Sequence, residues 1–543
     1  MKTKKKIKDV FVGNLKSIIP LFFLSLLSSV MFTLLLPFIN GRYFDELTRM
    51  DSNKLYETVF TLLLMNLIGL AISFFLSLFN NIISSRIALK INFELIEHIQ
   101  KSPLEYTNSI NPSYVNQQVN NDSHIVTDFF LSLLIQGIIS LFILLSTVFI
   151  MFKINILICM IFILIILVHI VIYFVFKKPI YRSAYRMKNE QSRLFSQMNR
   201  QLNNIQVIKQ QSWYSSIKEE LLINSEIFMK SLSHNSIVLN LSFFANNMIM
   251  QLFNISVLFI GGISVINGKM TIGEIVTITS YVNSALGSSR YFIDNFSNYQ
   301  SIKASIDRLD VHLSVDKEIN RSISLSSINK VTLKEVTFSL NDLCILKKFN
   351  FTFYKGKVYA ITGHNGRGKS SLINLISGLY QMYDGEIYFD DKNIRELEMY
   401  DVRKKIIGIV EQNPYIVVNG FKENIVYGIP SVKEDELATL IHKFNLELKS
   451  NEKLQSGEMI LSGGEVQKSS IIRTILKKPQ LLFLDEPTSM LDKDSSNTLM
   501  ETILELKKET IIIFVTHDSK LIECCDEIIN LNECVLNKIN SSV

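Results

Sequence analysis

The sequence predicts an α-helical membrane domain with six transmembrane helices and long cytoplasmic extensions, followed by an α/β domain. Two observations support this fold class. Six long runs without a formally charged side chain occupy the first 290 residues, and after Val331 short β-branched runs alternate with amphipathic helical patterns. The composition agrees, because 48% of the 543 residues are hydrophobic and only 20% are charged, against roughly a quarter in a soluble protein. We expect a membrane domain over residues 1–318, a linker over 319–330 and an α/β domain over 331–543.

Composition and charge exclude several classes of protein. A chain this apolar is not intrinsically disordered. The five cysteines are scattered, so they match neither a disulfide framework nor a metal-ligand spacing. The net charge of +6 is spread over the whole length, whereas a nucleic-acid-binding protein usually has a concentrated basic patch. The lipid bilayer is therefore an expected partner, and nucleic acid is not.

The charge-free runs are long enough to cross a bilayer, which requires about 20 apolar residues in a helix. Four runs are 23 to 28 residues long, a fifth has 38 and extends beyond the membrane, and a sixth has 15 and is rich in Thr, Ser and Asn. A secretory signal followed by soluble helices would not produce six such runs. The runs are residues 17–41, 58–85, 129–152, 154–176, 231–268 and 275–289.

The basic residues orient the spans. Residues 1–16 carry six lysines against Asp9, which keeps the N-terminus in the cytoplasm. Residues 177–230, with ten basic and four acidic side chains, return there. Residues 86–128 carry three basic and five acidic side chains, which by charge alone would favour the outside. Long loops follow the charge rule poorly, so the alternation of successive spans places this segment in the cytoplasm. We expect both excursions to be helical, for example around Arg193–Glu220. The sixteen residues before the first run are too few to fold an N-terminal peptidase.

A glycine-rich loop follows the apolar strand predicted over Lys357–Thr362. The segment Gly363–Ser370 reads G-x-x-x-x-G-K-S, and a helix is predicted directly after it. Glycines let backbone N–H groups point into such a loop, and the helix N-terminus adds a favourable dipole for phosphate. Lys369 can reach the β- and γ-phosphates, and the Ser370 hydroxyl can ligate Mg²⁺. The context of strand, loop and helix favours phosphate binding.

Two further apolar strands end in polar residues. Leu481–Leu484 is followed by Asp485 and Glu486, which suit a Mg²⁺ ligand and a base for water. A carboxylate pair of this kind more often caps the next helix when it stands alone. A third strand, Thr510–Val515, is followed by His517. A lone histidine at a strand end is usually structural, but this one is expected at the same sheet edge as the other two sites.

In their order along the chain these residues resemble the nucleotide-binding domain of an ABC transporter. The series is Gly363–Ser370 (Walker A), Gln412, Leu461–Glu465 (the signature LSGGE), Leu481–Glu486 (Walker B), Ser489–Asp492 (the D-loop) and His517. The signature is the most specific element, because many NTPases have a phosphate loop. Six spans fused to one such domain are similar to an exporter half-transporter. The resemblance covers essentially the whole chain and implies a P-loop NTPase fold and hydrolysis of ATP to ADP and phosphate coupled to transport.

The resemblance also implies roles for single residues. Ser370, Gln412 and Asp485 would hold Mg²⁺, while Gln412 also senses the attacking water, Glu486 polarises it and His517 contacts the γ-phosphate. The phosphates of ATP would be bound by Gly363, His364, Asn365, Gly366, Arg367, Gly368, Lys369, Ser370 and Ser371.

A second subunit is implied as well. In the family the signature residues Ser462, Gly463, Gly464 and Glu465 face the γ-phosphate of ATP held by the other subunit, and Asp492 lies across the same interface. A helix that opens with Ser-Gly-Gly also offers free N–H groups to an anion. One Walker A and one signature per chain imply a C2 homodimer, or a heterodimer with a homologous half-transporter.

Three departures from the family pattern stand out. Exporters usually stack adenine on an aromatic residue where this chain has Leu340, so the stacking contact is missing or supplied elsewhere. Glu465 stands where Gln is more common. The segment Gln455–Ile460 before the signature is shorter than usual. Asp485, Glu486 and His517 are all present, which argues against a degenerate site.

Polar faces on the last two spans bear on the cargo. Asn240, Asn247, Gln251 and Asn254 share one helical face of the fifth span. Thr277, Ser280, Ser284 and Ser288 do so on the sixth. Such residues either hydrogen-bond neighbouring helices, which is their ordinary use, or line a wet pathway, and for these two faces both interpretations remain open. A lining of amides and hydroxyls would suit a peptide or an amphipathic molecule better than an inorganic ion.

These observations favour an ATP-driven efflux pump of the plasma membrane. The expected cargo is a small peptide of the bacteriocin or pheromone kind, and a multidrug or lipid exporter is the alternative. A non-transporting ATP-dependent sensor or regulator is a third reading, which the intact Glu486 and His517 disfavour. The richness in Ile, Asn and Lys indicates a bacterial protein, with the nucleotide-binding domain in the cytoplasm.

Overall fold

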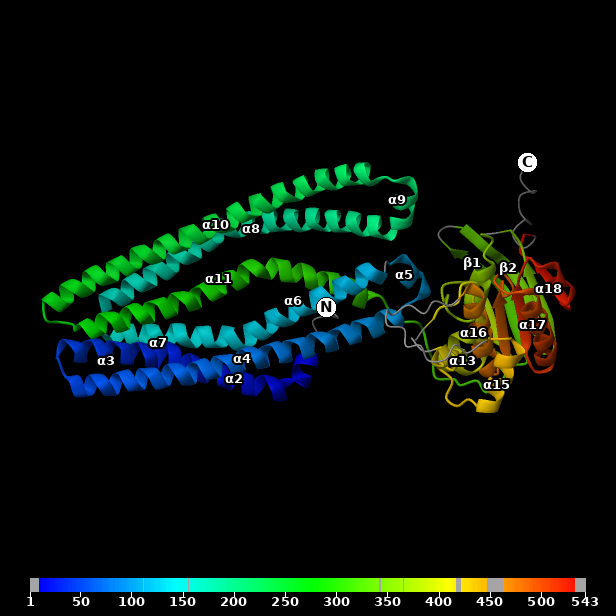
Figure 1. The fold of residues 1–543 in the computed structure, drawn as a ribbon, viewed down its shortest axis with the longest axis horizontal. Helices are drawn as coiled ribbons and strands as arrows, with labels where there is room; N and C mark the ends of the chain where they lie inside the picture. Colours follow the sequence, from blue (N-terminus) through cyan, green and yellow to red (C-terminus); the bar gives the residue numbers. More distant parts are fainter. Residues whose placement is uncertain are drawn as a thin grey trace. The chain divides into compact units, whose positions relative to one another are not determined.

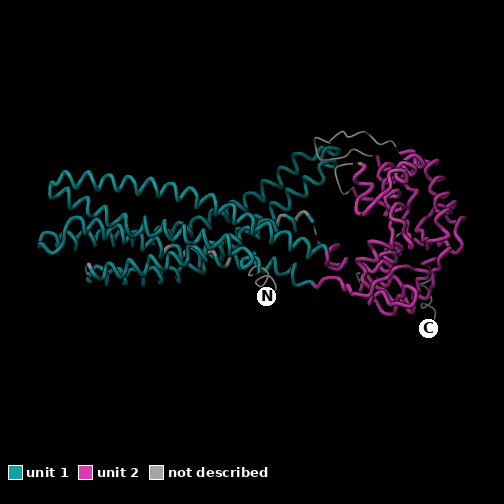
Figure 2. Tube along the Cα trace, turned by 90° about the horizontal axis from the view of Figure 1, so that it is seen from below, with its two compact units in different colours: residues 1–100, 110–315 teal, residues 101–109, 316–543 magenta. Residues whose placement is uncertain are grey.

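The computed structural model describes residues 9–110, 112–154, 156–340, 343–364, 366–416, 421–446 and 462–532. The chain divides into two compact units, shown in Figure 2. Unit 1 comprises residues 1–100 and 110–315, and its described residues form long helices. Unit 2 comprises residues 101–109 and 316–543 and contains two sheets with surrounding helices. The fold class predicted from the sequence is therefore confirmed.

The helices of unit 1 run lengthwise beside one another (Figure 1). The described residues of the charge-free runs lie in helices, except Asn267 and Gly268. Helices α4, α8 and α10 continue far beyond their runs, which confirms helical extensions. The elements are α2 (Leu15–Ser29), the π-helix η1 (Val30–Leu35), α3 (Leu36–Thr48), α4 (Ser52–Gln100), α6 (Pro112–Ser132), the π-helix η2 (Leu133–Gly137), α7 (Ile138–Ile154), α8 (Ile156–Asn203), α9 (Ile205–Gln211), α10 (Tyr214–Ile266) and α11 (Ile272–Ser314).

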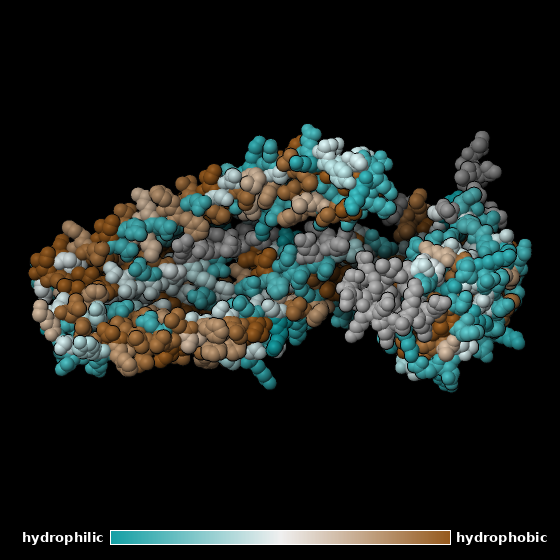
Figure 3. Space-filling model, in the orientation of Figure 1, coloured by the Kyte–Doolittle hydropathy of each residue, from teal (hydrophilic) through white to brown (hydrophobic). Residues whose placement is uncertain are grey.

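Five stretches among the described residues are long and apolar enough to cross a membrane. They run through α2 to α3, α4, α6 to α7, α8 and α10. The predicted sixth span lies in α11, which is long enough but carries the Thr, Ser and Asn residues noted above and is not among these five. Apolar side chains gather on the outer surface of these helices in Figure 3, and many large ones are exposed, such as Phe74, Phe149 and Phe174. A surface of this kind suits lipid.

The second excursion is helical, as expected, with two short interruptions. Within Arg193–Glu220, α8 ends at Asn203 and the short α9 precedes α10. The side-chain amide of Asn204 donates to the carbonyl of Arg200, and Ser212 adopts a left-handed backbone conformation with φ of 53°. The chain reverses direction here, and α8 and α10 lie side by side (Figure 1).

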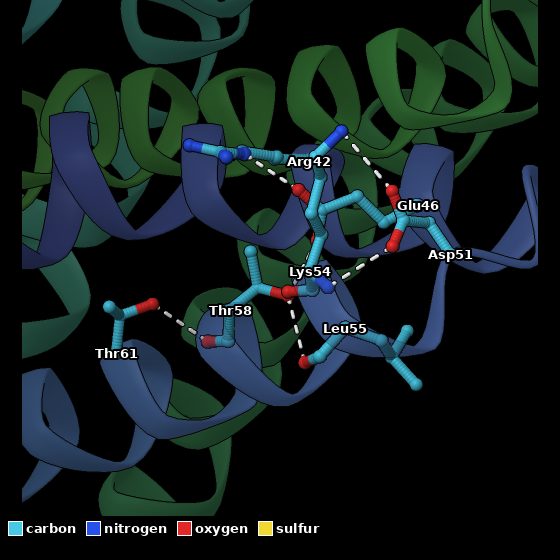
Figure 4. Close-up of polar contacts among 7 residues, drawn as sticks. All are labelled: Arg42, Glu46, Asp51, Lys54, Leu55, Thr58 and Thr61. Carbon is cyan, nitrogen blue, oxygen red and sulfur yellow. Dashed lines mark hydrogen bonds and ion pairs between the residues drawn. The ribbon is translucent and has the colours of Figure 1, made fainter.

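Two contacts fasten α3 to its neighbours near the start of α4 and α11. The buried Glu46 carboxylate accepts hydrogen bonds from Arg42 Nε and Thr58 Oγ1, both at 2.7 Å (Figure 4). Asp45 accepts from the N–H of Gly273 at 2.8 Å and from the hydroxyl of Thr271 at 3.0 Å, and so caps α11. The turns that connect these spans are therefore tied by carboxylates rather than left as loose loops.

Unit 2 has an antiparallel sheet in the order β2-β1-β4-β5 and a parallel sheet in the order β6-β7-β8-β3-β9. Its strands are β1 (Lys330–Leu340), β2 (Leu343–Tyr354), β3 (Val358–Thr362), β4 (Asp384–Phe389), β5 (Lys392–Asn393), β6 (Ile407–Val410), β7 (Leu481–Asp485), β8 (Ile511–Val515) and β9 (Glu527–Asn530). Its helices are α5 (Leu104–Ser109), α12 (Lys369–Ile376), η3 (Ile394–Glu396), α13 (Met399–Lys405), α14 (Phe421–Ile425), α15 (Glu434–Lys443), α16 (Gly463–Leu476), α17 (Lys493–Leu506), η4 (Lys507–Glu509) and α18 (Ser519–Glu523).

The parallel strands are short and apolar because helices cover both faces of their sheet. Tyr359, Phe483 and Ile513 are buried within the core that also holds the antiparallel sheet. The small helix α5 lies between α4 and α6 in the sequence and belongs to this unit. Leu104 packs against the core, and the carbonyl of Lys101 accepts from the N–H of Glu318 at 2.8 Å. A segment between two membrane-domain helices is therefore built into unit 2.

Candidate functional site

The loop after β3 has the geometry that a phosphate loop requires. Gly366 and Gly368 have φ of 79° and 86°, a region that side-chain-bearing residues rarely adopt. Gly368 is the N-cap of α12, whose first residue is Lys369. The ammonium of Lys369 donates to the carbonyl of Gly363 at 2.8 Å and lies 2.9 Å from Nε2 of His517. Asn365 lies outside the described residues, and the other predicted loop residues stand between β3 and the first turn of α12.

The carboxylate pair lies at the end of β7, where Asp485 is the last residue of the strand and Glu486 follows it. The hydroxyl of Ser370 donates to Oδ2 of Asp485 at 2.6 Å. Burial raises the pKa of the Asp485 carboxyl, and the hydrogen bond from Ser370 opposes this shift. Glu486 has φ of 45°, and its N–H donates to the carbonyl of Val515 at 2.8 Å. This bond to the end of β8 holds Glu486 in a conformation that a non-glycine residue seldom adopts.

Gln412 completes the group. It follows β6, and its side-chain amide donates to Oε2 of Glu486 at 2.7 Å. The strands β6, β7, β8 and β3 are parallel neighbours, so the residues that follow them meet at one edge of the sheet. The structure thus brings Lys369 to His517, Ser370 to Asp485, and Gln412 to Glu486.

A pocket of about 500 Å³ lies against this edge. One wall is aliphatic, formed by Leu340, Leu343 and Ile345 of β1 and β2. Ile345 packs on the loop, because a Cβ atom at Gly368 would lie 2.1 Å from its Cγ2 atom. The polar part of the lining consists of Gly366, Gly368, Lys369, Ser370, Ser371, Gln412, Asp485 and Glu486.

No aromatic ring lines this pocket among the described residues. Phe338, on the same strand as Leu340, is buried and pairs with Tyr380 at a centroid distance of 5.0 Å. With Leu340 at the usual aromatic position, the stacking contact is expected to be missing or supplied elsewhere. Leu343 and Ile345 line the pocket beside Leu340. Sequence reasoning missed these two residues, although the aliphatic run at the start of β2 was a usable signal.

The signature residues open α16. Ser462 is its N-cap, and the hydroxyl of Ser462 accepts from the N–H of Glu465 while the carboxylate of Glu465 accepts from the N–H of Ser462 at 2.8 Å. Glu465, which stands where Gln is more common, therefore closes a capping box. The spacing Ser-x-x-Glu was a sequence signal for this role. Leu461 and the shortened segment Gln455–Ile460 lie outside the described residues.

The signature glycines are packed against the D-loop of the same chain. A Cβ atom at Gly463 would lie 2.9 Å from the sulfur of Met490, and one at Gly464 would lie 2.9 Å from its carbonyl oxygen. Asp492 is the N-cap of α17 and forms an ion pair with Lys468 of α16 at 2.9 Å. The hydrogen bond from the Ser495 N–H, together with Lys468, holds the pKa of the Asp492 carboxyl far below its usual range. Signature and D-loop are therefore one structural element.

The predicted polar faces of unit 1 have different environments. On α10, the side chains of Asn240, Asn247 and Gln251 are exposed, and Asn254 is half-buried. On α11, Thr277 donates to the carbonyls of Gly273 and Pro37, so it joins α11 to α3. The hydroxyls of the other three predicted residues, Ser280, Ser284 and Ser288, each donate to the carbonyl four residues earlier in their own helix.

Comparisons with known proteins agree with this geometry. The model of the ABC transporter transmembrane region matches residues 18–289, and that of the ABC transporter domain matches residues 346–489. A solved structure of a bacterial Atm1-family ABC exporter with ATP bound superimposes with a TM-score of 0.84 at 18% identity, over 95% of this chain and 93% of that one.

Relatives are found among bacterial proteins. The microcin-J25 export ATP-binding/permease protein McjD of Escherichia coli is 28% identical over 50% of this chain and 48% of its own. A Staphylococcus aureus protein provisionally named as a multidrug export ATP-binding/permease protein is 29% identical over 53% of this chain and 52% of its own. The chain thus spans about half the length of the curated relatives it matches. Since the transmembrane-region model alone covers half of its residues, the chain belongs to the ABC transporter family, with an exporter fold in which the membrane region is fused to one ABC transporter domain.

Proposed function

We propose that this protein is an exporter half-transporter that hydrolyses ATP to ADP and phosphate and uses the cycle to move cargo out of the cell. The observation that supports this most is the meeting of three polar pairs at one sheet edge: Lys369 with His517, Ser370 with Asp485, and Gln412 with Glu486. Each pair joins segments that are far apart in the sequence, and each contains groups that phosphoryl transfer requires.

Lys369 and the backbone of its loop would bind the phosphates of ATP. The loop ends at the N-terminus of α12, where free N–H groups and the helix dipole favour an anion. The ammonium of Lys369, now hydrogen-bonded to the carbonyl of Gly363, lies within the loop and can turn to the β- and γ-phosphates. Ser371 and the loop glycines would add backbone donors.

Oxygen atoms at the edge suit Mg²⁺. The Asp485 carboxylate and the Ser370 hydroxyl lie 2.6 Å apart, and Gln412 adds a nearby amide oxygen. Mg²⁺ is usually held by one or two carboxylates together with substrate phosphates, so it needs no dense cluster. When bound, the ion would neutralise phosphate charge.

Glu486 would polarise the attacking water. Its carboxylate is oriented by the amide of Gln412, which can also hydrogen-bond that water. Attack of the water oxygen on the γ-phosphorus breaks the bond to the bridging oxygen of ADP, and the proton of the water passes towards the carboxylate. His517, beside Lys369, is placed to contact the γ-phosphate.

A second copy of the chain would complete each site. Ser462, Gly463, Gly464 and Glu465 form the N-terminal turn of α16, whose N–H groups can face a γ-phosphate held by the partner. Asp492 is fixed to the same helix through Lys468, so it would accompany the signature at the interface. Two equivalent sites in a C2 homodimer follow, and a heterodimer with a homologous half-transporter would use the same residues.

The proposed location is the plasma membrane of a bacterium, with the nucleotide-binding domain in the cytoplasm. A small peptide is the proposed cargo, and a drug or lipid is the alternative. One relative is named for export of a microcin and others for multidrug export, which supports an exporter without choosing between these cargoes. On α10, the exposed amides of Asn240, Asn247 and Gln251, with the half-buried Asn254, favour a cargo that forms hydrogen bonds.

A sensor that only binds ATP is the competing function. Purified chain in proteoliposomes distinguishes the two, with ATP turnover and cargo movement measured against a panel of peptides, drugs and lipids. An exporter shows turnover that one class of compound stimulates, together with transport of that class. Turnover without movement of any member of the panel would favour the sensor.

A further inference from the structure

A polar recess of about 540 Å³ opens in unit 1 between α2, α4, α6 and η2. Its size suits a small ligand or one end of a larger one. Leu21, Leu131 and Ile135 are buried and provide an apolar floor. The rest of the lining is mostly polar and consists of Ser25, Ser77, Asn80, Asn81, Asp128, Ser132 and Gln136, with Leu76.

The amides of this recess have no partner among the described residues. Asn80 and Asn81 lie in the charge-free run of the second span, Gln136 lies in that of the third, and all three side chains are exposed. Neighbouring polar groups do have partners: the hydroxyl of Ser132 hydrogen-bonds that of Tyr291 at 2.9 Å. Amide groups without hydrogen bonds are unfavourable in a bilayer. These three side-chain amides therefore need hydrogen bonds from water or from a bound molecule.

Asp128 adds a negative charge. Its carboxylate accepts a hydrogen bond from the buried Ser84 and is otherwise exposed to the recess. Arg86 lies on an adjoining surface with Asn81, but no lysine or arginine of the described chain forms an ion pair with Asp128. Asp128 directly precedes the third charge-free run, so it lies at the boundary of that predicted span. A carboxylate without a basic partner offers its negative charge to a cation.

We propose that this recess binds a cationic, amide-bearing part of the cargo. An ammonium or guanidinium group pairs with Asp128, peptide amides hydrogen-bond Asn80, Asn81 and Gln136, and an alkyl stem lies on the apolar floor. This assignment rests on the proposed export function and narrows the cargo to basic peptides and amphipathic amines. It adds a charged contact that the amide face of α10 does not provide.

An aminophospholipid headgroup offers the same ammonium chemistry, but it brings a phosphate close to Asp128, and like charges repel. A cationic group of the cargo brings no phosphate and has no such penalty. Binding of a lipid headgroup would depend on the lipid composition of the membrane, whereas binding of the cargo would not.

The test measures binding to the full chain in phosphatidylcholine nanodiscs without ATP. The probes are an acetylated tetrapeptide amide with one arginine and its citrulline counterpart, which has nearly the same shape and no charge. The wild-type chain should bind the arginine peptide at least about tenfold more tightly. Asp128→Asn should bring the two affinities within about twofold, and Asp128→Glu should retain the preference.

Ser84→Ala is the matched control, because it removes the hydrogen bond to Asp128 and keeps the charge. Its preference for the arginine peptide should survive. Equal affinity for the two peptides in the wild-type chain, no binding of either at millimolar concentration, or an Asp128→Asn variant that changes only melting temperature would overturn the proposal.

A second arm replaces part of the lipid with phosphatidylethanolamine. The preference should be unchanged. Loss of the preference in these nanodiscs would assign the recess to the lipid headgroup and overturn the cargo assignment. Because binding is measured without ATP, a failure of ATP-driven transport would count against the proposed function and leave this result standing.

Discussion

Glu486 combines a strained backbone with an oriented side chain. Its φ of 45° costs a non-glycine residue about 1 to 3 kcal/mol, which the surrounding structure must supply. The N–H bond to Val515 and the contact of the carboxylate with Gln412 do so from two neighbouring strands. A residue held in this way is positioned before any ligand arrives, as expected for a catalytic base.

Glu486→Gln should therefore abolish turnover and leave ATP binding intact. The amide keeps the shape of the side chain but cannot accept a proton, so ATP hydrolysis should fall by about a hundredfold or more. ATP affinity, measured by equilibrium binding, should stay within about threefold of wild type, because the loop and Lys369 are unchanged. Undiminished turnover would refute the assignment of the base.

The aliphatic wall beside the phosphate loop makes a prediction about the nucleotide base. Leu340, Leu343 and Ile345 can contact a base by dispersion alone, whereas base–aromatic stacking contributes about 1 to 3 kcal/mol. Leu340→Tyr should lower the dissociation constant for ATP by about fivefold or more. Leu340→Ile, which adds no ring, is the control. Tyrosine and isoleucine variants of equal affinity would show that this wall does not contact the base.

Between elements, the α3–α11 contact depends on two glycines. A Cβ atom at Gly273 would lie 2.1 Å from the carbonyl oxygen of Gly41, so the backbones approach too closely for any side chain. Gly273→Ala should destabilise the protein by about 1 to 3 kcal/mol through overpacking, measured by thermal unfolding in detergent. Gly262→Ala on α10 is the matched control, because nothing lies within 4 Å of its Cβ position. Equal melting temperatures for the two variants would contradict this account of the contact.

The exposed amides of α10 support a second element-scale prediction. Replacing Asn247 and Gln251 by Leu should change which compounds stimulate ATP turnover, because a pathway loses hydrogen-bonding groups. Asn246→Leu is the comparison, since its side-chain amide already donates to the carbonyl of Ser242. A double variant that alters only the melting temperature would identify these amides as helix–helix contacts.

Sequence patterns predicted the elements that carry strong local signals. The strands β3, β7 and β8 and the loop at Gly363–Ser370 were found because each is an apolar run followed by polar residues, and parallel topology then brings their ends together. Features that depend on distant contacts were not predictable. The membership of α5 in unit 2 depends on the packing of Leu104, and the recess at Asp128 depends on the approach of α2, α4 and α6. The adjacent Asn80 and Asn81 in a charge-free run were the available signal.

At the scale of the whole molecule, each unit holds part of what an exporter needs. Unit 1 carries the apolar helices and the polar recess, and unit 2 carries the nucleotide site. The chain has one phosphate loop and one signature, while the proposed reaction requires each loop to face the signature of another chain. The functional molecule in this account is therefore a dimer.

The most direct test of the central claim is ATP-dependent uptake in inverted membrane vesicles. A labelled compound that stimulates ATP turnover is added outside vesicles that contain the wild-type chain or Lys369→Ala, which should weaken ATP binding by about tenfold or more. The account predicts that the compound accumulates inside wild-type vesicles with ATP, and that neither a non-hydrolysable ATP analogue nor the variant supports accumulation. Equal accumulation with and without ATP, or in both kinds of vesicle, would contradict it.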